Sequence, residues 1–178
     1  MSRPLIVFDL DGTLIDTAPD LLDSLNHVIT GEGLEPIPPA ELRAHVGHGG
    51  RAMLRHAYAA QRKPIDDAVI ERQLGAFVEH YAAGMPGRSQ PFDGALACMD
   101  RFAQAGWLMA VCTNKLEGLS RTLLTALGLA DRFAAICGAD TFAVRKPDPA
   151  HLTGTIDRAG GVVSRAVMVG DSGTDIDT

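Results

Sequence analysis

The sequence is short of cysteine, of long apolar runs and of positive charge, and each shortage removes a class of protein. Its three cysteines are scattered without a Cys-x-x-Cys pair, which favours a reducing, cytoplasmic compartment; Cys112 and Cys137 sit in apolar runs and are expected to be buried. No apolar stretch is long enough to span a membrane, and the first one is too short for a secretory signal. The formal net charge of -6 argues against a nucleic-acid or polybasic membrane-binding surface. We therefore expect neither nucleic acid nor a membrane as a partner, and we expect a monomer or a homodimer.

What the chain does contain is enough apolar material for a core. Of its 178 residues, 46% are hydrophobic, which supports one or two small domains. Leu5–Phe8 form an unbroken apolar run, which is typical of a strand buried on both faces of a parallel sheet. Asp9 and Asp11 follow at once, and carboxylates this close together repel each other and invite a cation such as Mg²⁺. Open α/β sheets bind ligands at the carboxyl ends of their strands, so these acids mark a candidate site.

Two kinds of pattern divide the chain. Residues 17–88 show helical periodicity, enough for about four helices, and no strand signal. Residues 89–178 instead alternate helix and strand, and the predicted strands are 107–112, 134–137 and 166–169. Such alternation implies a parallel sheet wrapped by helices. We therefore predict an α/β fold with a doubly wound, Rossmann-like parallel-sheet core made of residues 1–16 and 89–178, into which residues 17–88 are inserted as a helical cap domain.

Polar groups follow the ends of the predicted strands, and a parallel sheet gathers such groups on one edge. Carboxylates there would hold Mg²⁺, while a hydroxyl and a lysine would contact the oxygens of a transferring phosphoryl group. One carboxylate would be left to attack phosphorus. Phosphoryl transfer needs mostly positioning and charge neutralisation, and this set supplies both. Its members are Asp9, Asp11, Thr113, Lys146, Asp171 and Asp175.

The same residues carry a resemblance to a known family. The chain resembles the haloacid dehalogenase-like hydrolase superfamily, whose members carry four motifs in a fixed order. In chain order, these motifs are Asp-x-Asp-Gly-Thr, a Thr after a strand, a Lys and Gly-Asp-x-x-x-Asp. Together they span the whole chain and are highly specific, although no single one is. Val-Gly-His-Gly at 46–49 and Thr-Asn-Lys at 113–115 look like its phosphoglycolate phosphatase branch. The four motifs are Asp9–Thr13, Thr113, Lys146 and Gly170–Asp175.

This resemblance implies a Mg²⁺-dependent phosphatase of a small phosphorylated metabolite, which converts 2-phosphoglycolate to glycolate and phosphate. It implies that Asp9 is the nucleophile and becomes an aspartyl phosphate. Asp11 would protonate the leaving alkoxide and then help to activate water. Mg²⁺ would be bound by Asp9, by the backbone carbonyl of Asp11 and by Asp171, while Asp175 would act on the metal through water or through the other ligands.

The resemblance also implies which groups hold the substrate. Thr113 and the backbone of Asn114 would bind phosphoryl oxygens, and Lys146 would neutralise charge on Asp9 and on the phosphoryl group. Further substrate contacts are expected from the first motif and from a loop of the cap. From the residue type alone we add Arg51, because a cap cation could pair with a substrate carboxylate. The expected substrate-binding residues are Gly12, Thr13, Asn114, Gly47, His48, Gly49 and Arg51.

Other functions stay open on the residues alone. The same scaffold serves a sugar-phosphate phosphatase, a mutase or a pyrophosphatase, although Thr13 leans away from a mutase. A receiver-like phosphoacceptor domain also combines acids, Mg²⁺, Thr and Lys, but its acceptor follows a middle strand and it lacks a helical cap. Taken singly, Lys146 reads as a surface lysine, Thr113 as a helix cap and Arg51 as a solvated helix residue.

The chain stops at Thr178, soon after the fourth motif. At this point the superfamily's fold continues with a helix and a further strand. We therefore expect the C-terminal part of the core to be missing and one edge of the sheet to lie open.

Overall fold

The structure is a computed structural model that describes residues 3–42, 46–47 and 49–178. The chain forms two compact units. The core unit comprises Met1–Asp16 and Gln90–Thr178, and the helical unit comprises Thr17–Ser89. The helical unit is therefore inserted between the first strand of the core unit and the rest of it. Among the described residues, no helix has both the length and the apolar character needed to cross a membrane.

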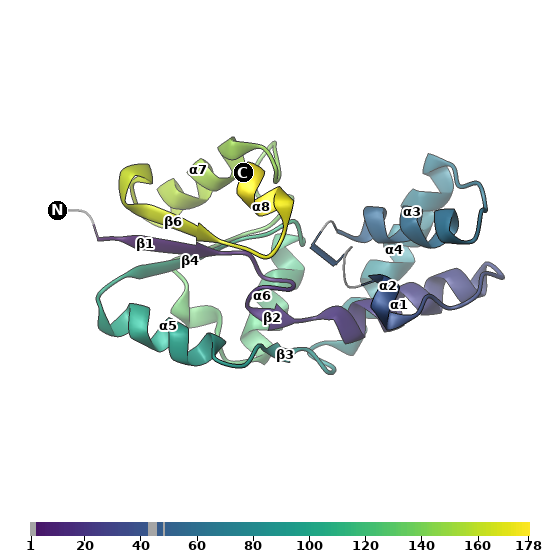
Figure 1. Cartoon of the computed structure of the whole chain (residues 1–178), viewed down its shortest axis with the longest axis horizontal. Coiled ribbons are helices and arrows are strands. Elements are labelled where there is room, and N and C mark those ends of the chain that lie inside the picture. Colours follow the sequence, from purple (N-terminus) through teal and green to yellow (C-terminus); the bar gives the residue numbers. More distant parts are fainter. Residues whose placement is uncertain (1–2, 43–45, 48) are drawn as a thin grey trace. The chain divides into compact units, whose positions relative to one another are not determined.

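The core unit is built on a four-stranded parallel sheet with the strand order β5-β4-β1-β6 (Figure 1). Its strands are β1 (Leu5–Phe8), β4 (Leu108–Cys112), β5 (Ala135–Cys137) and β6 (Ala166–Val169). Every residue of β1 is buried, as the unbroken apolar run predicts. The chain moves from β1 to one side for β4 and β5, and then crosses back to the other side for β6. Such a reversal of strand order, here beside β1, is where doubly wound sheets bind ligands.

Helices cover both faces of this sheet, so the predicted doubly wound α/β core is confirmed. α5 (Ala95–Gln104) lies on one face and α7 (Pro149–Arg158) on the other (Figure 1). α6 (Glu117–Ala126) packs against β5, and the short α8 (Gly173–Asp177) follows β6. Two 3-10 helices, η2 and η3, span Ala130–Arg132 and Val163–Arg165. The apolar core that contacts α7 contains Leu5, Val7, Ala110, Cys112, Ala135, Cys137, Ile156 and Ala159.

The two strand cysteines are packing residues, as predicted. Cys112 of β4 lies opposite Cys137 of β5, and both are buried and unpaired. Burial raises the pKa of the Cys112 thiol to about 11 and also raises that of Cys137. Both thiols therefore stay protonated and unreactive at neutral pH.

Among its described residues, the helical unit has four α-helices, in line with the periodicity of the sequence. They are α1 (Ala18–Gly31), α2 (Pro39–Leu42), α3 (Gly50–Ala60) and α4 (Asp67–Gly84). α4 packs against both α1 and α3. Thr17 occupies the position before α1, but its side chain makes no capping hydrogen bond. The fully buried side chains of this unit include Leu25, Ile29, Met53, Leu54, Ile70 and Tyr81.

Asp20 ties the start of α1 to the segment that follows α4. Its carboxylate accepts hydrogen bonds from the N–H of Arg88 at 3.0 Å and from the N–H and hydroxyl of Ser89 at 2.7 and 2.6 Å. These bonds explain why Ser89 belongs to the helical unit. The chain returns to the core unit directly afterwards, where Gln90–Pro91 (β3) pair antiparallel with Ile15–Asp16 (β2). These two-residue strands are too short to show a periodic pattern, and they were not expected from the sequence.

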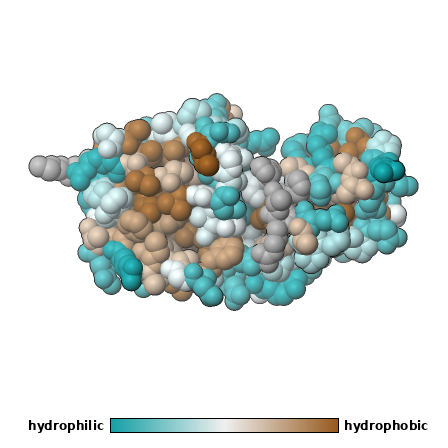
Figure 2. Space-filling model, in the orientation of Figure 1, coloured by the Kyte–Doolittle hydropathy of each residue, from teal (hydrophilic) through white to brown (hydrophobic). Residues whose placement is uncertain are grey.

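β6 is an edge strand with exposed apolar side chains. In the part of the chain that the structure describes, it pairs with β1 alone, which confirms the expected open edge. Val167 and Val169 are 49% and 38% exposed, and Ile176 of α8 is 87% exposed. Figure 2 shows apolar residues gathered on this part of the core unit's surface. An edge of this kind favours pairing with a further strand.

The loops that follow β4 and β5 pack directly against each other. The N–H of Thr113 donates to the carbonyl of Cys137 at 3.0 Å, and the N–H of Ala139 donates to the carbonyl of Lys115 at 2.9 Å. A Cβ on Gly138 would lie 2.4 Å from that Lys115 oxygen and 2.2 Å from the backbone nitrogen of Glu117. Glycine is therefore needed at position 138, because a Cβ there would clash with backbone atoms, which cannot rotate away as a side chain could.

We expect Gly138→Ala to lower the free energy of unfolding by about 1–3 kcal/mol, because the added methyl group forces the two loops apart. Gly118→Ala is the matched control, since a Cβ on Gly118 in the first turn of α6 meets nothing within 4 Å. This control should leave stability unchanged or raise it by up to about 1 kcal/mol. Urea denaturation measures both, and a Gly138→Ala protein as stable as the control would contradict the packing described above.

Candidate active site

The strand ends bring the four predicted motifs to one edge of the core unit. Asp9 directly follows β1, Thr113 directly follows β4, and Asp171 lies two residues beyond β6. Phe8 lies opposite Val111 in one neighbouring strand and opposite Val169 in the other, so the three strands end at nearly the same level. The lysine of the third motif reaches the same edge from the loop before α7. The residues of the four motifs therefore lie together at the carboxyl ends of the strands, as expected.

A tight turn shapes the first motif. The carbonyl of Leu10 accepts hydrogen bonds from the N–H groups of Leu14 and Ile15 at 3.1 and 3.0 Å. Gly12 adopts a φ of +86°, a conformation that residues with a side chain rarely take. A Cβ on Gly12 would also lie 2.6 Å from Oδ2 of Asp171. The turn can therefore approach the fourth motif this closely only because a glycine stands at 12.

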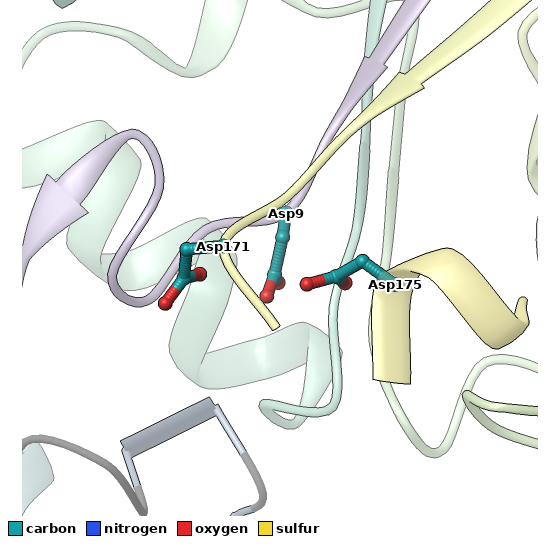
Figure 3. A group of neighbouring side chains, drawn as sticks. All are labelled: Asp9, Asp171 and Asp175. Atoms are coloured by element: carbon teal, nitrogen blue, oxygen red, sulfur yellow. The ribbon is translucent and has the colours of Figure 1, made fainter. Parts of the chain in front are cut away.

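Three carboxylates form a cluster at this edge (Figure 3). Oxygen atoms of Asp9, Asp171 and Asp175 lie within 4.8 Å of one another. Lys146 joins two of them, because its Nζ lies 3.0 Å from Oδ1 of Asp9 and donates to Oδ1 of Asp175 at 2.5 Å. Asp9, Asp175 and Lys146 are buried, whereas Asp171 is exposed. The cluster is thus enclosed by protein on one side and accessible from the side of Asp171.

The donor atoms of this cluster fit a hard divalent cation. Among the described residues, no hydrogen bond reaches Oδ2 of Asp9 or Oδ2 of Asp171, because the bonds that the protein makes to these carboxylates all end on Oδ1. Both oxygens of Asp175 are occupied, one by Lys146 and the other by Ser172. Carboxylate oxygens are the protein ligands that Mg²⁺ prefers. Asp9 and Asp171 are therefore suited to direct ligation, and Asp175 is suited to support the cluster.

Burial dominates the electrostatics of the cluster. It raises the pKa of Asp9 to about 6; the Lys146 ammonium opposes this shift, and the carboxylates of Asp175 and Asp11 add to it. Burial alone would lower the pKa of Lys146, but attraction to Asp9 and Asp175 outweighs it and raises that pKa, so Lys146 stays charged. Burial alone would raise the pKa of Asp175, but hydrogen bonds, first of all from Lys146, hold it below its usual value. A cation bound beside Asp9 would favour its ionised form.

Thr113 and Asn114 occupy the loop after β4 in positions that leave donors available. Oγ1 of the buried Thr113 accepts a hydrogen bond from the N–H of Lys115 at 3.2 Å, so the hydroxyl hydrogen points elsewhere. Nδ2 of Asn114 donates to the carbonyl of Lys146 at 3.2 Å and so ties this loop to the lysine loop. An available hydroxyl hydrogen is what a phosphoryl oxygen requires. The phosphoryl-binding roles of Thr113 and Asn114 remain predictions.

Lys115 was assigned no role from the sequence, yet it lies in the site. Its Nζ donates to both carboxylate oxygens of Asp11, at 3.0 and 3.2 Å, and both residues are buried. The side chain of Asp11 is accordingly not a member of the three-carboxylate cluster, so only its backbone carbonyl remains as the predicted metal ligand. One signal could have pointed to Lys115: the chain contains only three lysines, and two of them, Lys115 and Lys146, belong to the motifs.

The substrate residues predicted for the cap belong to the helical unit. Gly49 precedes α3 with a φ of +86°, and Gly47 is half-buried. Arg51 donates from Nη2 to Oε2 of Glu71 at 2.8 Å, so it is ion-paired on the surface of this unit. His48 lies outside the described residues. The substrate-binding roles of these residues remain predictions.

Comparison with known proteins agrees with the motifs. The family model described as haloacid dehalogenase-like hydrolase matches residues 6–178. The chain is 58% identical over 178 residues to a phosphoglycolate phosphatase of Mesorhizobium japonicum. This alignment covers all of this chain and 78% of that protein. It is 50% identical over 173 residues to a phosphoglycolate phosphatase of Agrobacterium fabrum, covering 97% of this chain and 74% of that one. The solved structure of a predicted phosphoglycolate phosphatase from Haemophilus somnus 129pt matches with a TM-score of 0.88 at 25% identity, over 99% of this chain and 80% of that one. The resemblance is confirmed, and the chain belongs to the haloacid dehalogenase-like hydrolase family.

Proposed function

We propose that this chain is a Mg²⁺-dependent phosphatase that hydrolyses 2-phosphoglycolate to glycolate and phosphate through an aspartyl phosphate. The observation that carries the proposal is the buried Asp9 carboxylate, which bonds to Lys146 through Oδ1 and lies in a cluster with Asp171 and Asp175. The choice of substrate is supported by two relatives at 58% and 50% identity, both named phosphoglycolate phosphatase.

In the first half-reaction, Asp9 attacks phosphorus through a carboxylate oxygen. A bond forms between that oxygen and phosphorus, and the bond between phosphorus and the glycolate oxygen breaks. Asp11 gives its proton to the departing oxygen, so that glycolate leaves as an alcohol. Lys146 stands between Asp9 and Asp175 and offsets the negative charge that gathers on the reacting groups.

In the second half-reaction, water attacks the phosphorus of the aspartyl phosphate. The Asp11 carboxylate takes a proton from that water, the bond between phosphorus and Asp9 breaks, and phosphate leaves. Asp9 is then a carboxylate and Asp11 is protonated, as at the start, so the cycle needs no other reactant. The hydroxyl of Thr113 and the N–H of Asn114 hold phosphoryl oxygens in both halves, assisted by Gly12–Thr13 of the first motif.

The proposed metal ligands are Asp9, Asp171 and the backbone carbonyl of Asp11. When bound there, Mg²⁺ neutralises charge on the phosphoryl oxygens and on the carboxylates. Asp175 contributes by fixing Lys146 and Ser172, because both of its oxygens are engaged by these residues. Asp175 would therefore support the metal site through these contacts without binding the ion directly.

We also propose that the helical unit acts as a cap that supplies substrate contacts, a role that rests on the family resemblance. Its contacts would come from the loop that contains Gly47, His48 and Gly49. Arg51 would pair with the substrate carboxylate, for which it would have to exchange its present partner Glu71.

We expect Asp9→Asn to reduce phosphate release from 2-phosphoglycolate by about 10³-fold or more, because the nucleophile is lost. Release should be measured beside pyrophosphate and a panel of sugar phosphates, with Mg²⁺ and with EDTA. Asp157→Asn, an exposed aspartate of α7, is the matched control and should behave as wild type. Preferred turnover of another panel member would replace the proposed substrate, and full activity of Asp9→Asn or in EDTA would contradict the proposed chemistry.

Gly12→Ala should weaken Mg²⁺ binding, because the new Cβ would displace the Asp171 carboxylate that lies 2.6 Å away. We expect about a tenfold or larger rise in the Mg²⁺ concentration needed for half-maximal activity. Gly106→Ala is the control, because Gly106 has a similar φ of +79° but open space around it. Both variants should lose roughly 1 kcal/mol of stability from backbone strain, so an equal Mg²⁺ requirement in the two variants would refute the close approach.

Asp9→Asn should also stabilise the metal-free protein at neutral pH. The pKa of Asp9 is about 6 in the folded chain against 3.8 as the reference value, so the folded chain binds more protons between these values. The contribution of Asp9 to stability is therefore lost as the pH rises through this window. At about pH 7.5 in EDTA the ionised carboxylate costs on the order of 1–3 kcal/mol, and the amide removes that cost. Urea denaturation should show this gain near pH 7.5 and little of it near pH 4; a gain of the same size at both values would rule out Asp9 ionisation as its cause.

A further inference from the structure

Lys115 and Asp11 form a buried ion pair beside the Asp9 cluster. The ammonium of Lys115 lies 3.0 Å from Oδ1 and 3.2 Å from Oδ2 of Asp11, so it contacts both edges of the carboxylate. The two side chains are only 4% and 9% exposed. We propose that Lys115 is a positioning residue, which holds Asp11 in the orientation that proton transfer to and from the substrate requires. This inference rests on the proposed phosphatase function.

The burial of this pair argues against a purely stabilising role. Removing two charges from water is costly, and the mutual attraction of the ions offsets this cost only when the geometry is good. A buried pair is therefore a poor means of gaining stability compared with apolar packing. Its position within the catalytic motifs instead indicates a functional reason for keeping it. That reason is a fixed orientation of the carboxylate.

The backbone of Lys115 is held from both sides, which makes the lysine a fixed support. Its N–H donates to Oγ1 of Thr113 at 3.2 Å, and its carbonyl accepts from the N–H of Ala139 at 2.9 Å. Gly138 lets the second loop approach so closely that a Cβ there would lie 2.4 Å from the Lys115 oxygen. The ammonium therefore starts from an anchored backbone at the carboxyl edge of the sheet. A support of this kind is what precise placement of a catalytic side chain needs.

Each aspartate of the first motif has its own buried lysine. Lys146 contacts Asp9, and Lys115 contacts Asp11. The whole chain contains three lysines, so two thirds of them serve this pair of aspartates, and the remaining one, Lys63, is exposed. The two lysines have different roles. Lys146 offsets charge on the nucleophile Asp9, and Lys115 orients Asp11, which transfers protons. An ammonium can do this in both halves of the cycle, because it donates strongly to the carboxylate and, more weakly, to the carbonyl oxygen of the protonated acid.

The dependence of the rate on the leaving group distinguishes a positioning role of Lys115 from a purely structural one. An alkoxide is a strong base and needs the proton of Asp11, whereas p-nitrophenolate departs readily without it. For Lys115→Met we expect kcat/KM to fall about 100-fold on 2-phosphoglycolate and on 2-hydroxyethyl phosphate, which has no carboxylate, but less than about 5-fold on p-nitrophenyl phosphate. The ratio between substrates does not depend on how much of the variant is folded. Lys63→Met is the matched control and should leave all three values unchanged.

Two further variants sharpen the test. Asp11→Asn should show the same dependence on the leaving group, and adding Lys115→Met to it should cause little further loss, because both changes remove one function. An equal fall on all three substrates would overturn the proposal in favour of a structural role. A fall confined to 2-phosphoglycolate would overturn it in favour of a contact between Lys115 and the substrate carboxylate.

The wild-type protein distinguishes failure of this inference from failure of the proposed function. Wild-type turnover of the other two esters without 2-phosphoglycolate would remove the proposed substrate only, and the comparison of alkyl with aryl ester would still decide the role of Lys115. If the wild type hydrolyses none of the three esters, the proposed function is wrong and this inference fails with it.

Discussion

Repulsion among carboxylates at the end of β1 is the constraint on which the rest of this structure depends. Asp9, Asp171 and Asp175 bring oxygen atoms within 4.8 Å of one another, and burial raises the pKa of Asp9 to about 6. The protein offsets part of this charge with the buried Lys146, which contacts two of the three carboxylates. Asp171 is the exposed member of the cluster, and oxygen atoms of this kind suit a divalent cation. In the proposed function, a bound cation would offset the remaining repulsion among the carboxylates.

The fold meets this constraint through its strand order. β1 lies between β4 and β6, so groups that follow three different strands reach the same point although they are far apart in the sequence. Two glycines then allow the loops beyond the strands to pack closely against neighbouring groups. Gly12 lets the first motif approach Asp171, and Gly138 lets the loop after β5 approach Lys115. Each approach fixes one charged partner of the first motif, which is why the geometry of these loops matters as much as the identity of the acids.

The strands and the site of the core unit could largely be predicted from the sequence, because they leave local signals. The apolar run before Asp9 is buried on every residue, and the predicted strand at 107–112 appears as Leu108–Cys112. Other features leave no such signal. β2 and β3 have two residues each, and the role of Lys115 depends on loop packing between segments remote from Asp11. Thr17 precedes α1 but makes no capping bond, because its backbone is helical and not extended, and a local sequence pattern does not determine this. The contacts of Gly47, Gly49 and Arg51 with a substrate remain predictions, since they depend on a bound ligand and not on local pattern.

The central claim is that Asp9 carries the phosphoryl group during turnover. The most direct measurement is to mix the protein with Mg²⁺ and 2-phosphoglycolate, stop the reaction with acid within the first turnover, and map the phosphorylated peptide by mass spectrometry. The account predicts an acid-stable, base-labile phosphate on Asp9 that disappears as free phosphate is released. Release of phosphate at the full rate with no phosphate on Asp9 at any time, or with phosphate on a different residue, would contradict it.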